Sequence, residues 1–255
     1  MITVAVTGAG GRMGTEVVKA VSECDDLSLV ALIDPSYTQD ETHFATIEDA
    51  LQSAKFDVLV DFTRPNVVAH NIEAALKKGV NCVVGTTGLS QEKLEELAAY
   101  AVNDACLFVA PNFAIGAVMM MEISQIVAKY MEHVEIIELH HDNKLDAPSG
   151  TALRTAELIA AARSVAPKKP GKETESASCP GARGADCEGI SIHSVRLPGL
   201  VAHQEVLFGD KGQTLSIRHD SIDRTSFMPG VVLACRKVPQ HHGLIVGLEH
   251  LLEDE

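Results

Sequence analysis

The sequence predicts an α/β protein built from two parts. The first is an N-terminal Rossmann-like parallel sheet with helices on both faces, and the second is an α+β domain with a mixed or antiparallel sheet. Three observations lead to this prediction. Short apolar runs alternate with helical stretches over the first ~110 residues. A glycine-rich turn joins the first of these runs to the first helix. After Pro111 the alternation gives way to a long helix, a polar strand end and further strand-like runs.

Five short apolar runs supply the strands of the first part, because a parallel sheet covered on both faces needs strands that are apolar throughout. They are Ile2–Thr7, Leu27–Ile33, Val58–Asp61, Val80–Val84 and Cys106–Val109. Helices are predicted between them at Met13–Val21, at Val67–Lys78, which Gly79 ends, and at Gln91–Val102, with Ser90 as N-cap.

The second part begins with a predicted helix at Ile115–Met131. We interpret its Met119, Met120 and Met121 as core or interface residues. A strand at Val134–Leu139, a helix at Ala152–Ala162 and a proline-containing flexible connection at Arg163–Cys187 follow.

Three strand-like runs separated by glycine-containing turns then predict an antiparallel meander. They are Ile190–Leu197, His203–Phe208 and Thr214–Arg218, and a helix at Ser226–Lys237 with an acidic tail ends the chain. We therefore expect a dinucleotide-binding domain at residues 1–111 and a substrate-binding and oligomerisation domain at 112–225. A C-terminal segment at 226–255 is expected to pack back on the first domain.

The charge balance argues against some partners. The chain of 255 residues has a formal net charge of −14, whereas nucleic acid binding needs a basic surface. The apolar runs are far shorter than the ~20 residues of a membrane span. The opening Met1-Ile-Thr-Val-Ala-Val is typical of a strand and not of a signal peptide. We expect a cytoplasmic protein that contacts neither nucleic acid nor membrane.

The cysteines and paired histidines do not predict a metal site. Six scattered cysteines indicate reduced thiols of a cytoplasmic protein, although Cys179 and Cys187, which flank a glycine-rich stretch, could be bridged. Adjacent strand residues point to opposite faces, so the pairs His140-His141 and His241-His242 would not converge on one ion.

The glycine-rich turn Gly8-Ala-Gly-Gly-Arg-Met-Gly14 predicts a dinucleotide site. Glycines let a diphosphate approach the backbone at the positive end of a helix, although the spacing here is G-x-x-G-x-x-G. Asp34 ends the second strand, where an acidic side chain can accept hydrogen bonds from the adenosine ribose. Because Asp34 would repel a 2′-phosphate, we predict that NADH is used at least as well as NADPH. Arg12 could still reach such a phosphate.

Three more turns follow predicted strands at the carboxyl edge of the sheet, where α/β proteins bind ligands. Gly85-Thr-Thr-Gly88 and Ala110-Pro-Asn-Phe113 are expected to border the nicotinamide half of the cofactor. Asp61-Phe-Thr-Arg-Pro65 ends the third strand in a similar way. It either borders the cofactor as well or only places Pro65 at the first position of a helix.

The stretch Glu138-Leu-His-His-Asp-Asn-Lys-Leu-Asp-Ala-Pro-Ser-Gly-Thr151 is the strongest functional signal. A strand brings possible proton donors to its end, and a helix start with free backbone N–H groups follows. This arrangement suits the binding and protonation of a small carboxylate. The alternative is a solvated polar loop, but acid–base groups rarely cluster beside an anion site by chance.

Taken together, these motifs make the chain resemble the dihydrodipicolinate reductase (4-hydroxy-tetrahydrodipicolinate reductase) family of the diaminopimelate route to lysine, over essentially its whole length. They are the Gly8–Gly14 loop, Asp61-Phe-Thr, Gly85-Thr-Thr-Gly88, Pro111-Asn-Phe, Glu138-Leu-His-His, Lys144, Asp146-Ala-Pro-Ser-Gly-Thr151, His193-Ser-Val-Arg-Leu-Pro-Gly and Arg218-His-Asp-Ser. One departure is Asp142-Asn143, where many members carry a basic residue and a histidine.

The resemblance implies transfer of a hydride from NADH or NADPH to 4-hydroxy-tetrahydrodipicolinate, and a homotetramer whose second domains pair through their sheets. It gives His140 an acid–base role and Lys144 a proton-donor role, and it implies substrate binding by His141, Ser149, Gly150 and Thr151. The implied cofactor contacts are Gly8, Ala9, Gly10, Gly11, Arg12, Met13, Asp34, Gly85, Thr86, Thr87, Ala110, Pro111, Asn112 and Phe113.

The residue chemistry agrees with that activity. A ring with two carboxylates needs a cation and N–H donors, which Lys144 and the helix start at Ser149 provide. Hydride addition to a conjugated imine leaves electron density that an acid must neutralise, and a histidine can do so near neutral pH. Two alternatives stay open: a dehydrogenase acting on aspartate or homoserine, and a regulator that senses NADH by changing its assembly.

Overall fold

The computed structural model describes residues 1–163 and 181–252. The chain divides into two compact units, one made of Met1–Ile115 with Arg224–Glu255 and the other of Gly116–Asp223. Most of the predicted flexible connection, including Cys179, lies outside the described residues. Its end is not a loop, because Ala185–Cys187 forms a short strand, β8.

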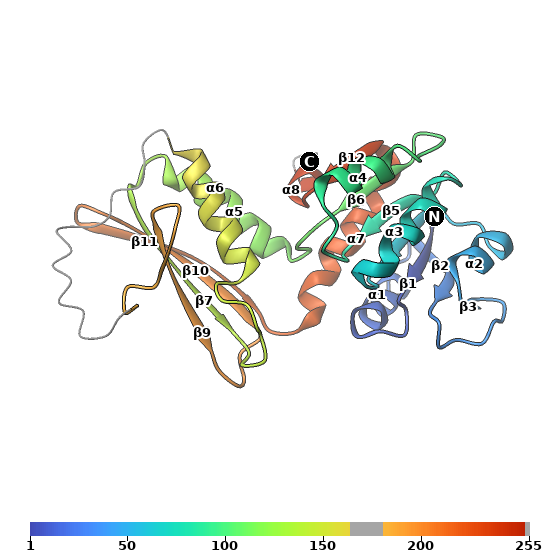
Figure 1. Ribbon diagram of the computed structural model, residues 1–255, viewed down its shortest axis with the longest axis horizontal. Helices are drawn as coiled ribbons and strands as arrows, with labels where there is room; N and C mark the ends of the chain where they lie inside the picture. The colour runs from blue at the N-terminus through green and yellow to red at the C-terminus, as the bar shows by residue number, and fades with distance from the viewer. Residues whose placement is uncertain (164–180, 253–255) are drawn as a thin grey trace. The chain divides into compact units, whose positions relative to one another are not determined.

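Within the described residues, seven parallel strands form the sheet of the first unit, in the order β12-β6-β5-β4-β1-β2-β3 (Figure 1). They are β1 (Ile2–Thr7), β2 (Leu27–Ile33), β3 (His43–Phe44), β4 (Val58–Asp61), β5 (Asn81–Val84), β6 (Cys106–Val109) and β12 (Gly243–Val246). The strand order grows outward from β1 in both directions, which is the doubly wound arrangement of Rossmann folds. The predicted fold class is therefore confirmed.

Helices cover both faces of this sheet. On one face, α1 (Arg12–Ser22) packs with α7 (Met228–Lys237) against β1. On the other, α3 (Pro65–Leu76) lies between α2 (Ile47–Ser53) and α4 (Gln91–Ala98). Burial of Ile72, Leu76 and Leu97 against the strands forms a core from which water is excluded, and this burial is the main force holding the layers together.

Several predicted boundaries differ from the structure. Pro65 is the first residue of α3, so that interpretation of the Asp61–Pro65 turn is confirmed. Ser90 caps α4 as predicted, but the helix ends at Ala98 and not at Val102. The α-helical pattern stops there because the N–H groups of Tyr100 and Ala101 donate to carbonyls only three residues earlier, and the N–H of Val102 donates to Leu76. The strands β3 and β12 and the helices α2 and α8 (Glu249–Leu252) were not predicted.

The second unit contains a mixed sheet in the order β11-β10-β7-β9-β8. Its strands are β7 (His133–His140), β8, β9 (Ile190–Arg196), β10 (Ala202–Asp210) and β11 (Gln213–Ser221). The predicted antiparallel meander of the last three strands is wrong. Of these three strands, only β10 and β11 pair directly with each other, because β7 lies between β9 and β10 and pairs with β9 in parallel.

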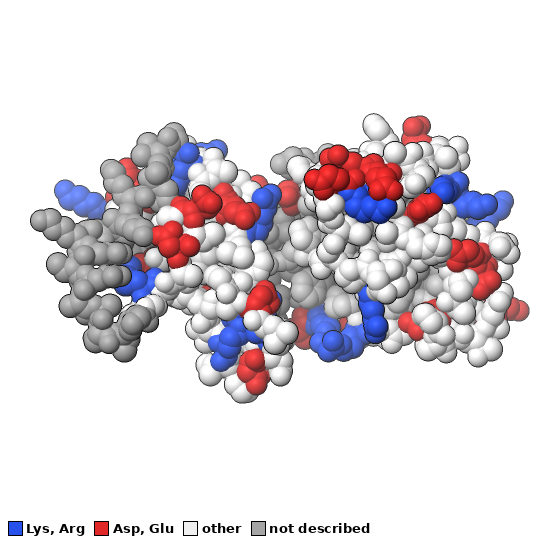
Figure 2. All heavy atoms as spheres, viewed as in Figure 1, with Lys and Arg blue, Asp and Glu red and all other residues white. Residues whose placement is uncertain are grey.

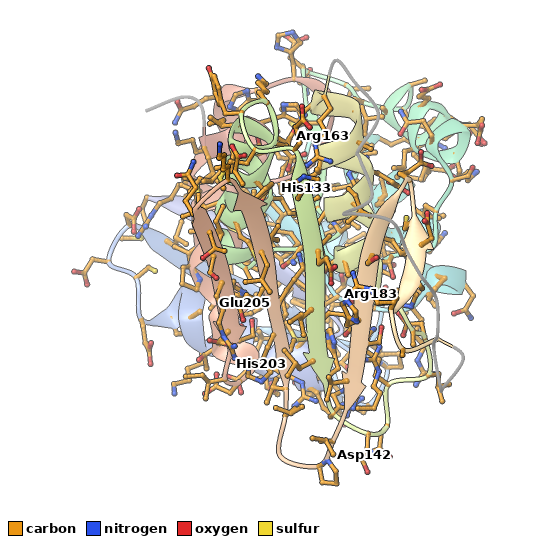
Figure 3. All side chains as sticks on the ribbon, turned by 90° about the vertical axis from the view of Figure 1, so that its left-hand side faces the viewer. His133, Asp142, Arg163, Arg183, His203 and Glu205 are labelled. Atoms are coloured by element: carbon orange, nitrogen blue, oxygen red, sulfur yellow. The ribbon has the colours of Figure 1, made fainter. Side chains whose placement is uncertain are left out.

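Strand β7 lies at the centre of this sheet, and its buried residues alternate along it as they do in a strand with one covered face. Val134 and Ile136 face α5 (Ile115–Ala128) and α6 (Gly150–Ala162), in one core with Met120 of α5 and Ile159 of α6. The other sheet face, which we call the open sheet face, is seen in Figure 3 with Glu205 and His203 labelled on it. Among the residues that the structure describes, helices thus cover one face of this sheet only.

Three further features bear on the possible partners. Met120 and Met121 are buried as predicted, whereas Met119 is 41% exposed. On the face shown in Figure 2, Lys and Arg side chains form separate groups among acidic and neutral ones. No helix in residues 1–163 and 181–252 is long and apolar enough to span a membrane.

Candidate active site

The glycine-rich turn leaves the end of β1 and packs tightly against the start of α1. The N–H groups of Gly8 and Ala9 both donate to the Ile33 carbonyl of β2, and Gly11 donates to Gly8 at 2.9 Å. A Cβ added at Gly14 would lie 2.0 Å from the Gly8 carbonyl oxygen, so only glycine permits this approach.

The start of α1 is suited to an anion. The first turn of this helix has neither a side-chain cap nor an acidic residue. Its leading N–H groups lack helical partners and carry the positive end of the helix dipole. A dinucleotide diphosphate therefore fits this turn, with backbone N–H groups as donors.

Asp34 lies beside the glycine-rich turn at the end of β2. One carboxylate oxygen accepts from the Gly10 N–H at 3.1 Å, and the other accepts from the N–H and hydroxyl of Ser36. Partial burial alone would raise the pKa of Asp34, but the hydrogen bonds from Ser36 and Gly10 outweigh it and lower that pKa. Asp34 is therefore an anion at neutral pH, held against the turn.

A buried carboxylate joins the carboxyl ends of three strands. Asp61 of β4 is fully buried and accepts hydrogen bonds from Thr7 of β1, from Thr86 after β5 and from Asn71 of α3, each at 2.8 Å. Thr63 donates to it as well. These contacts satisfy an otherwise costly buried charge. They also fix the positions of the turns that follow these strands.

Aromatic packing sets the shape of the neighbouring turns. The Phe62 ring lies so close to Gly85 that an added Cβ would be 2.1 Å from it, and it contacts Phe113 at a centroid distance of 5.6 Å. Ala9, Ala110 and Phe113 are at most 2% exposed. Their side chains pack inward, so any contact they make with a cofactor would come from backbone atoms.

The predicted cofactor residues therefore gather at one edge of the first unit, at the carboxyl ends of β1, β2, β5 and β6. The predicted catalytic and substrate residues form a second group, in the other unit, where β7 ends and α6 begins.

Glu138 is the centre of this second group. It is fully buried on the helix-facing side of β7. Its carboxylate accepts from both terminal nitrogens of Arg196 at 2.8 Å, from His140 Nδ1 at 2.5 Å and from the Ser149 N–H at 3.2 Å. Burial by itself would raise the pKa of Glu138, but hydrogen bonds from His140, Arg196 and Ser194 lower it to about 2.

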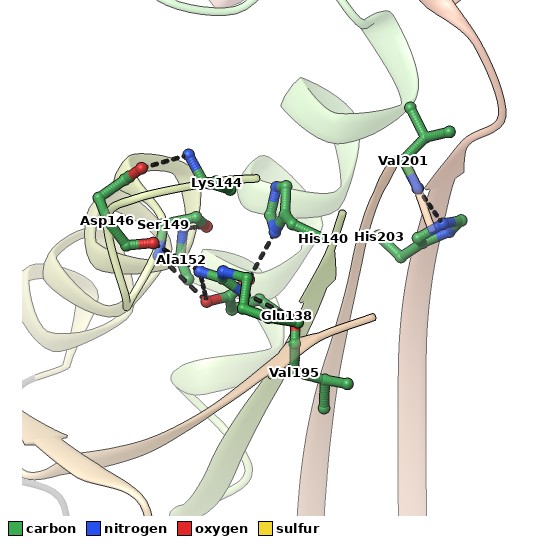
Figure 4. A network of polar contacts seen from close by, with 10 residues as sticks. Glu138, His140, Lys144, Asp146, Ser149, Ala152, Val195, Val201 and His203 are labelled. Carbon is green, nitrogen blue, oxygen red and sulfur yellow. Dashed lines mark hydrogen bonds and ion pairs between the residues drawn. The ribbon is translucent and has the colours of Figure 1, made fainter. Parts of the chain in front are cut away.

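Polar contacts extend from Glu138 to Lys144 (Figure 4). Arg196 also donates to the Asp146 carbonyl at 2.7 Å, and the Asp146 carboxylate pairs with Lys144 Nζ at 2.8 Å. One connected network thus joins His140 to Lys144 through Glu138, Arg196 and Asp146.

The start of α6 lies beside this network. The Ser149 hydroxyl caps the helix by accepting from the Ala152 N–H at 3.2 Å, and the Ser149 side chain is almost fully buried. Gly150 is exposed, and a Cβ added there would meet no atom within 4 Å. His141 is exposed and His140 is largely covered. The surface therefore offers backbone N–H groups, an ammonium and an imidazole in one region.

Sequence reasoning missed the roles of Glu138 and Arg196. A signal was available for Glu138, because it follows Val134 and Ile136 at spacings of two and so falls on the buried face of the strand. An acidic residue at such a position needs a partner. Arg196 lies in the motif His193-Ser-Val-Arg-Leu-Pro-Gly that carries the resemblance, but sequence reasoning assigned it no role, because its place opposite His140 depends on the parallel pairing of β7 with β9.

Comparisons with known proteins give the same family for both units. Residues 2–113 match the family model described as dihydrodipicolinate reductase, N-terminus, and residues 116–252 match dihydrodipicolinate reductase, C-terminus. A 4-hydroxy-tetrahydrodipicolinate reductase of Listeria welshimeri is 51% identical, with 98% of this chain and 99% of the relative covered. The enzyme of that name from Mycolicibacterium smegmatis is also 51% identical, with 98% of each chain covered.

Solved structures give the same result. A dipicolinate-bound dihydrodipicolinate reductase from Paenisporosarcina sp. TG-14 is 44% identical and superposes with a TM-score of 0.90, covering 98% of this chain and 99% of that chain. A probable dehydrogenase from Thermotoga maritima shares only the fold, at 12% identity and a TM-score of 0.65 over 98% of this chain and 92% of its own. The full-length match and the paired family models show that this chain belongs to the dihydrodipicolinate reductase family.

Proposed function

We propose that this chain reduces 4-hydroxy-tetrahydrodipicolinate to tetrahydrodipicolinate with a reduced nicotinamide cofactor, in the diaminopimelate route to lysine. The family membership carries this proposal. In the overall change the ring gains one hydride and one proton and loses one water molecule. The chain therefore has to bind a dicarboxylate, hold a cofactor and deliver a proton.

The first unit supplies the cofactor residues. When bound, a reduced nicotinamide dinucleotide supplies the hydride. The uncapped first turn of α1, at Arg12 and Met13, would hold its diphosphate, and Asp34 would accept from its adenosine ribose. Gly85–Thr87 and Ala110–Phe113 would border its nicotinamide half.

The second unit supplies the substrate residues. The Lys144 ammonium and the N–H groups of Gly150 and Thr151 would neutralise the two carboxylates, and His141 would add a further donor. Ser149 supports this site by capping α6. A crystal structure with reduced cofactor and pyridine-2,6-dicarboxylate is expected to show the diacid on Lys144, Gly150 and Thr151. Binding of the diacid elsewhere would contradict the assignment.

His140 would act as the acid. Its Nδ1 is engaged by Glu138, which leaves Nε2 to give a proton to the ring as the hydride's electron pair moves through the conjugated system. Lys144 would share this proton delivery from the other end of the network.

A coupled assay tests the function. Purified protein should oxidise NADH or NADPH only when dihydrodipicolinate synthase and its two substrates, pyruvate and aspartate semialdehyde, are present. Oxidation with aspartate semialdehyde alone would indicate a homoserine-type dehydrogenase. Cofactor binding without oxidation in any mixture would instead favour a regulator.

Cofactor preference is the first quantitative prediction. Because the Asp34 carboxylate is ionised and would face a 2′-phosphate, we expect the Michaelis constant for NADH to be no higher than that for NADPH. The Asp34→Ser variant should lower the constant for NADPH by about tenfold, since the like-charge repulsion is removed.

Glu41→Gln is the matched control, because it removes an exposed negative charge from the same loop. Its cofactor preference should equal that of the wild type. A preference of about a hundredfold for NADPH in the wild type, equal to about 2.7 kcal/mol, would contradict the prediction.

The assembly and compartment also belong to this proposal. We propose a homotetramer in which second units pair through the open sheet face, where half-buried Ile137, Leu139 and Leu207 lie among polar residues. Light scattering should then give four times the chain mass of 27.2 kDa. Unbridged Cys82, Cys106 and Cys235 are consistent with the reducing cytoplasm.

A further inference from the structure

Glu138 presents an unusual combination of burial and charge. Its side chain is 0% exposed, on the strand face that otherwise carries Val134 and Ile136. A carboxylate in such a place persists as an anion only when hydrogen bonds and opposite charge replace water. Arg196 provides both through two N–H donors at 2.8 Å. Burial alone would raise the pKa of Glu138, but the hydrogen bonds from His140, Arg196 and Ser194 lower it to about 2.

The ionised state decides how His140 is protonated. An ionised carboxylate can only accept hydrogen bonds. The 2.5 Å contact between Glu138 Oε2 and His140 Nδ1 therefore requires a proton on Nδ1. In a neutral imidazole that proton leaves the lone pair on Nε2, and in the charged ring Nε2 carries the proton that can be delivered.

The same carboxylate orients two other parts of the site. It accepts the Ser149 N–H and so fixes the residue that caps α6. Through Arg196 it also holds the backbone of Asp146, the partner of Lys144. Both terminal nitrogens of Arg196 are engaged in these contacts, with Glu138, the Val195 carbonyl and the Asp146 carbonyl.

We propose that Glu138 is a positioning residue for the reaction. It sets the tautomer and ring orientation of His140, and it fixes the start of α6 and the loop of residues 141–149, which carries Lys144, relative to that ring. This inference rests on the proposed function. It assigns to Glu138 no contact with substrate or cofactor.

A second glutamate on β7 provides a matched comparison. Glu135 also accepts from a histidine and an arginine, namely His193 Nε2 at 2.8 Å and Arg183. It lies on the open sheet face and is 29% exposed, and its partners His193 and Arg183 belong neither to α6 nor to the loop of residues 141–149 that carries Lys144. A purely structural carboxylate–histidine–arginine group would behave alike at either position.

The test compares Glu138→Gln with Glu135→Gln in the full-length protein, with folding checked by thermal unfolding and mass by light scattering. Because an amide can donate to Nδ1 and so favour the wrong tautomer, we expect Glu138→Gln to lower kcat by about 10²-fold or more, with a much smaller change in the substrate KM. Glu135→Gln should retain the wild-type kcat. Glu138→Asp, which keeps the charge but withdraws it by one methylene, should give an intermediate kcat.

NMR shifts of the imidazole nitrogens give a readout that does not depend on activity. Wild-type His140, assigned by the loss of its signals in His140→Gln, should carry its proton on Nδ1, and Glu138→Gln should change this. A wild-type proton on Nε2 alone, or a folded Glu138→Gln variant with kcat within about threefold of the wild type, would overturn the proposal. Absence of reductase activity in the wild type would instead count against the proposed function, whatever the tautomer.

Discussion

The His140→Gln variant is expected to lose turnover by ~10²–10⁴-fold while still binding the cofactor. The imidazole is the group nearest to Glu138 in the network and the one whose free nitrogen can deliver a proton to the reduced ring. Glutamine keeps a polar side chain of similar length but cannot act as an acid near neutral pH. The measurement is kcat in the synthase-coupled assay, with cofactor binding followed separately by fluorescence.

His193→Gln is the control for this substitution. His193 is also paired with a glutamate of the same sheet, Glu135, but lies on the open sheet face. Its replacement should leave kcat unchanged. Near-full turnover in His140→Gln would show that another group protonates the ring.

Replacement of Lys144 should lower kcat/KM by a factor of comparable size. In this case, however, the loss should come from both a higher substrate KM and a lower kcat. The Lys144 ammonium is 23% exposed and pairs with Asp146, whose pKa it lowers by donating a hydrogen bond. We expect Lys144→Met to raise the substrate KM and to lower kcat, for a combined loss of ~10²–10⁴-fold in kcat/KM. Steady-state kinetics with varied substrate measure both constants.

Lys144→Arg separates the two roles, because a guanidinium keeps the charge but does not release a proton near neutral pH. Recovery of KM without recovery of kcat would support proton donation by Lys144. Recovery of both would limit Lys144 to neutralising a carboxylate. Lys211→Met, which removes an exposed lysine from the β10–β11 hairpin of the same unit, should change neither constant.

The parts of the fold that follow local rules could be predicted from the sequence. The strands β1, β2, β4 and β6 have the predicted bounds, because each is a short apolar run ended by a polar or glycine-containing turn. Strand β12 was missed because Gly243–Val246 is too short to stand out beyond a predicted helix. The prediction of a meander was wrong because β7 pairs with β9, more than fifty positions further along the chain, and periodicity cannot detect such a pairing.

The residues of the candidate site also fall into those that the sequence could predict and those that it could not. His140, Lys144 and the α6 start occupy one contiguous stretch, so their clustering was visible in the sequence. Arg196 and Asp61 act through contacts between distant segments, and those contacts are set by strand order and register. Burial is the property that sequence reasoning most underestimated, since it turns Glu138 from an ordinary acid into the centre of a network.

The late return of the chain to its first sheet has a consequence for synthesis on the ribosome. Helix α7 and strand β12 belong to the first unit, yet they are translated only after the whole of residues 116–223. The sheet of the first unit therefore lacks its last strand while the second unit is being synthesised. Until Gly243–Val246 leaves the ribosomal exit tunnel, the outer side of β6 is an unpaired strand edge. An unpaired edge can pair with a strand of another chain, so nascent chains on the same mRNA are open to strand exchange at this stage.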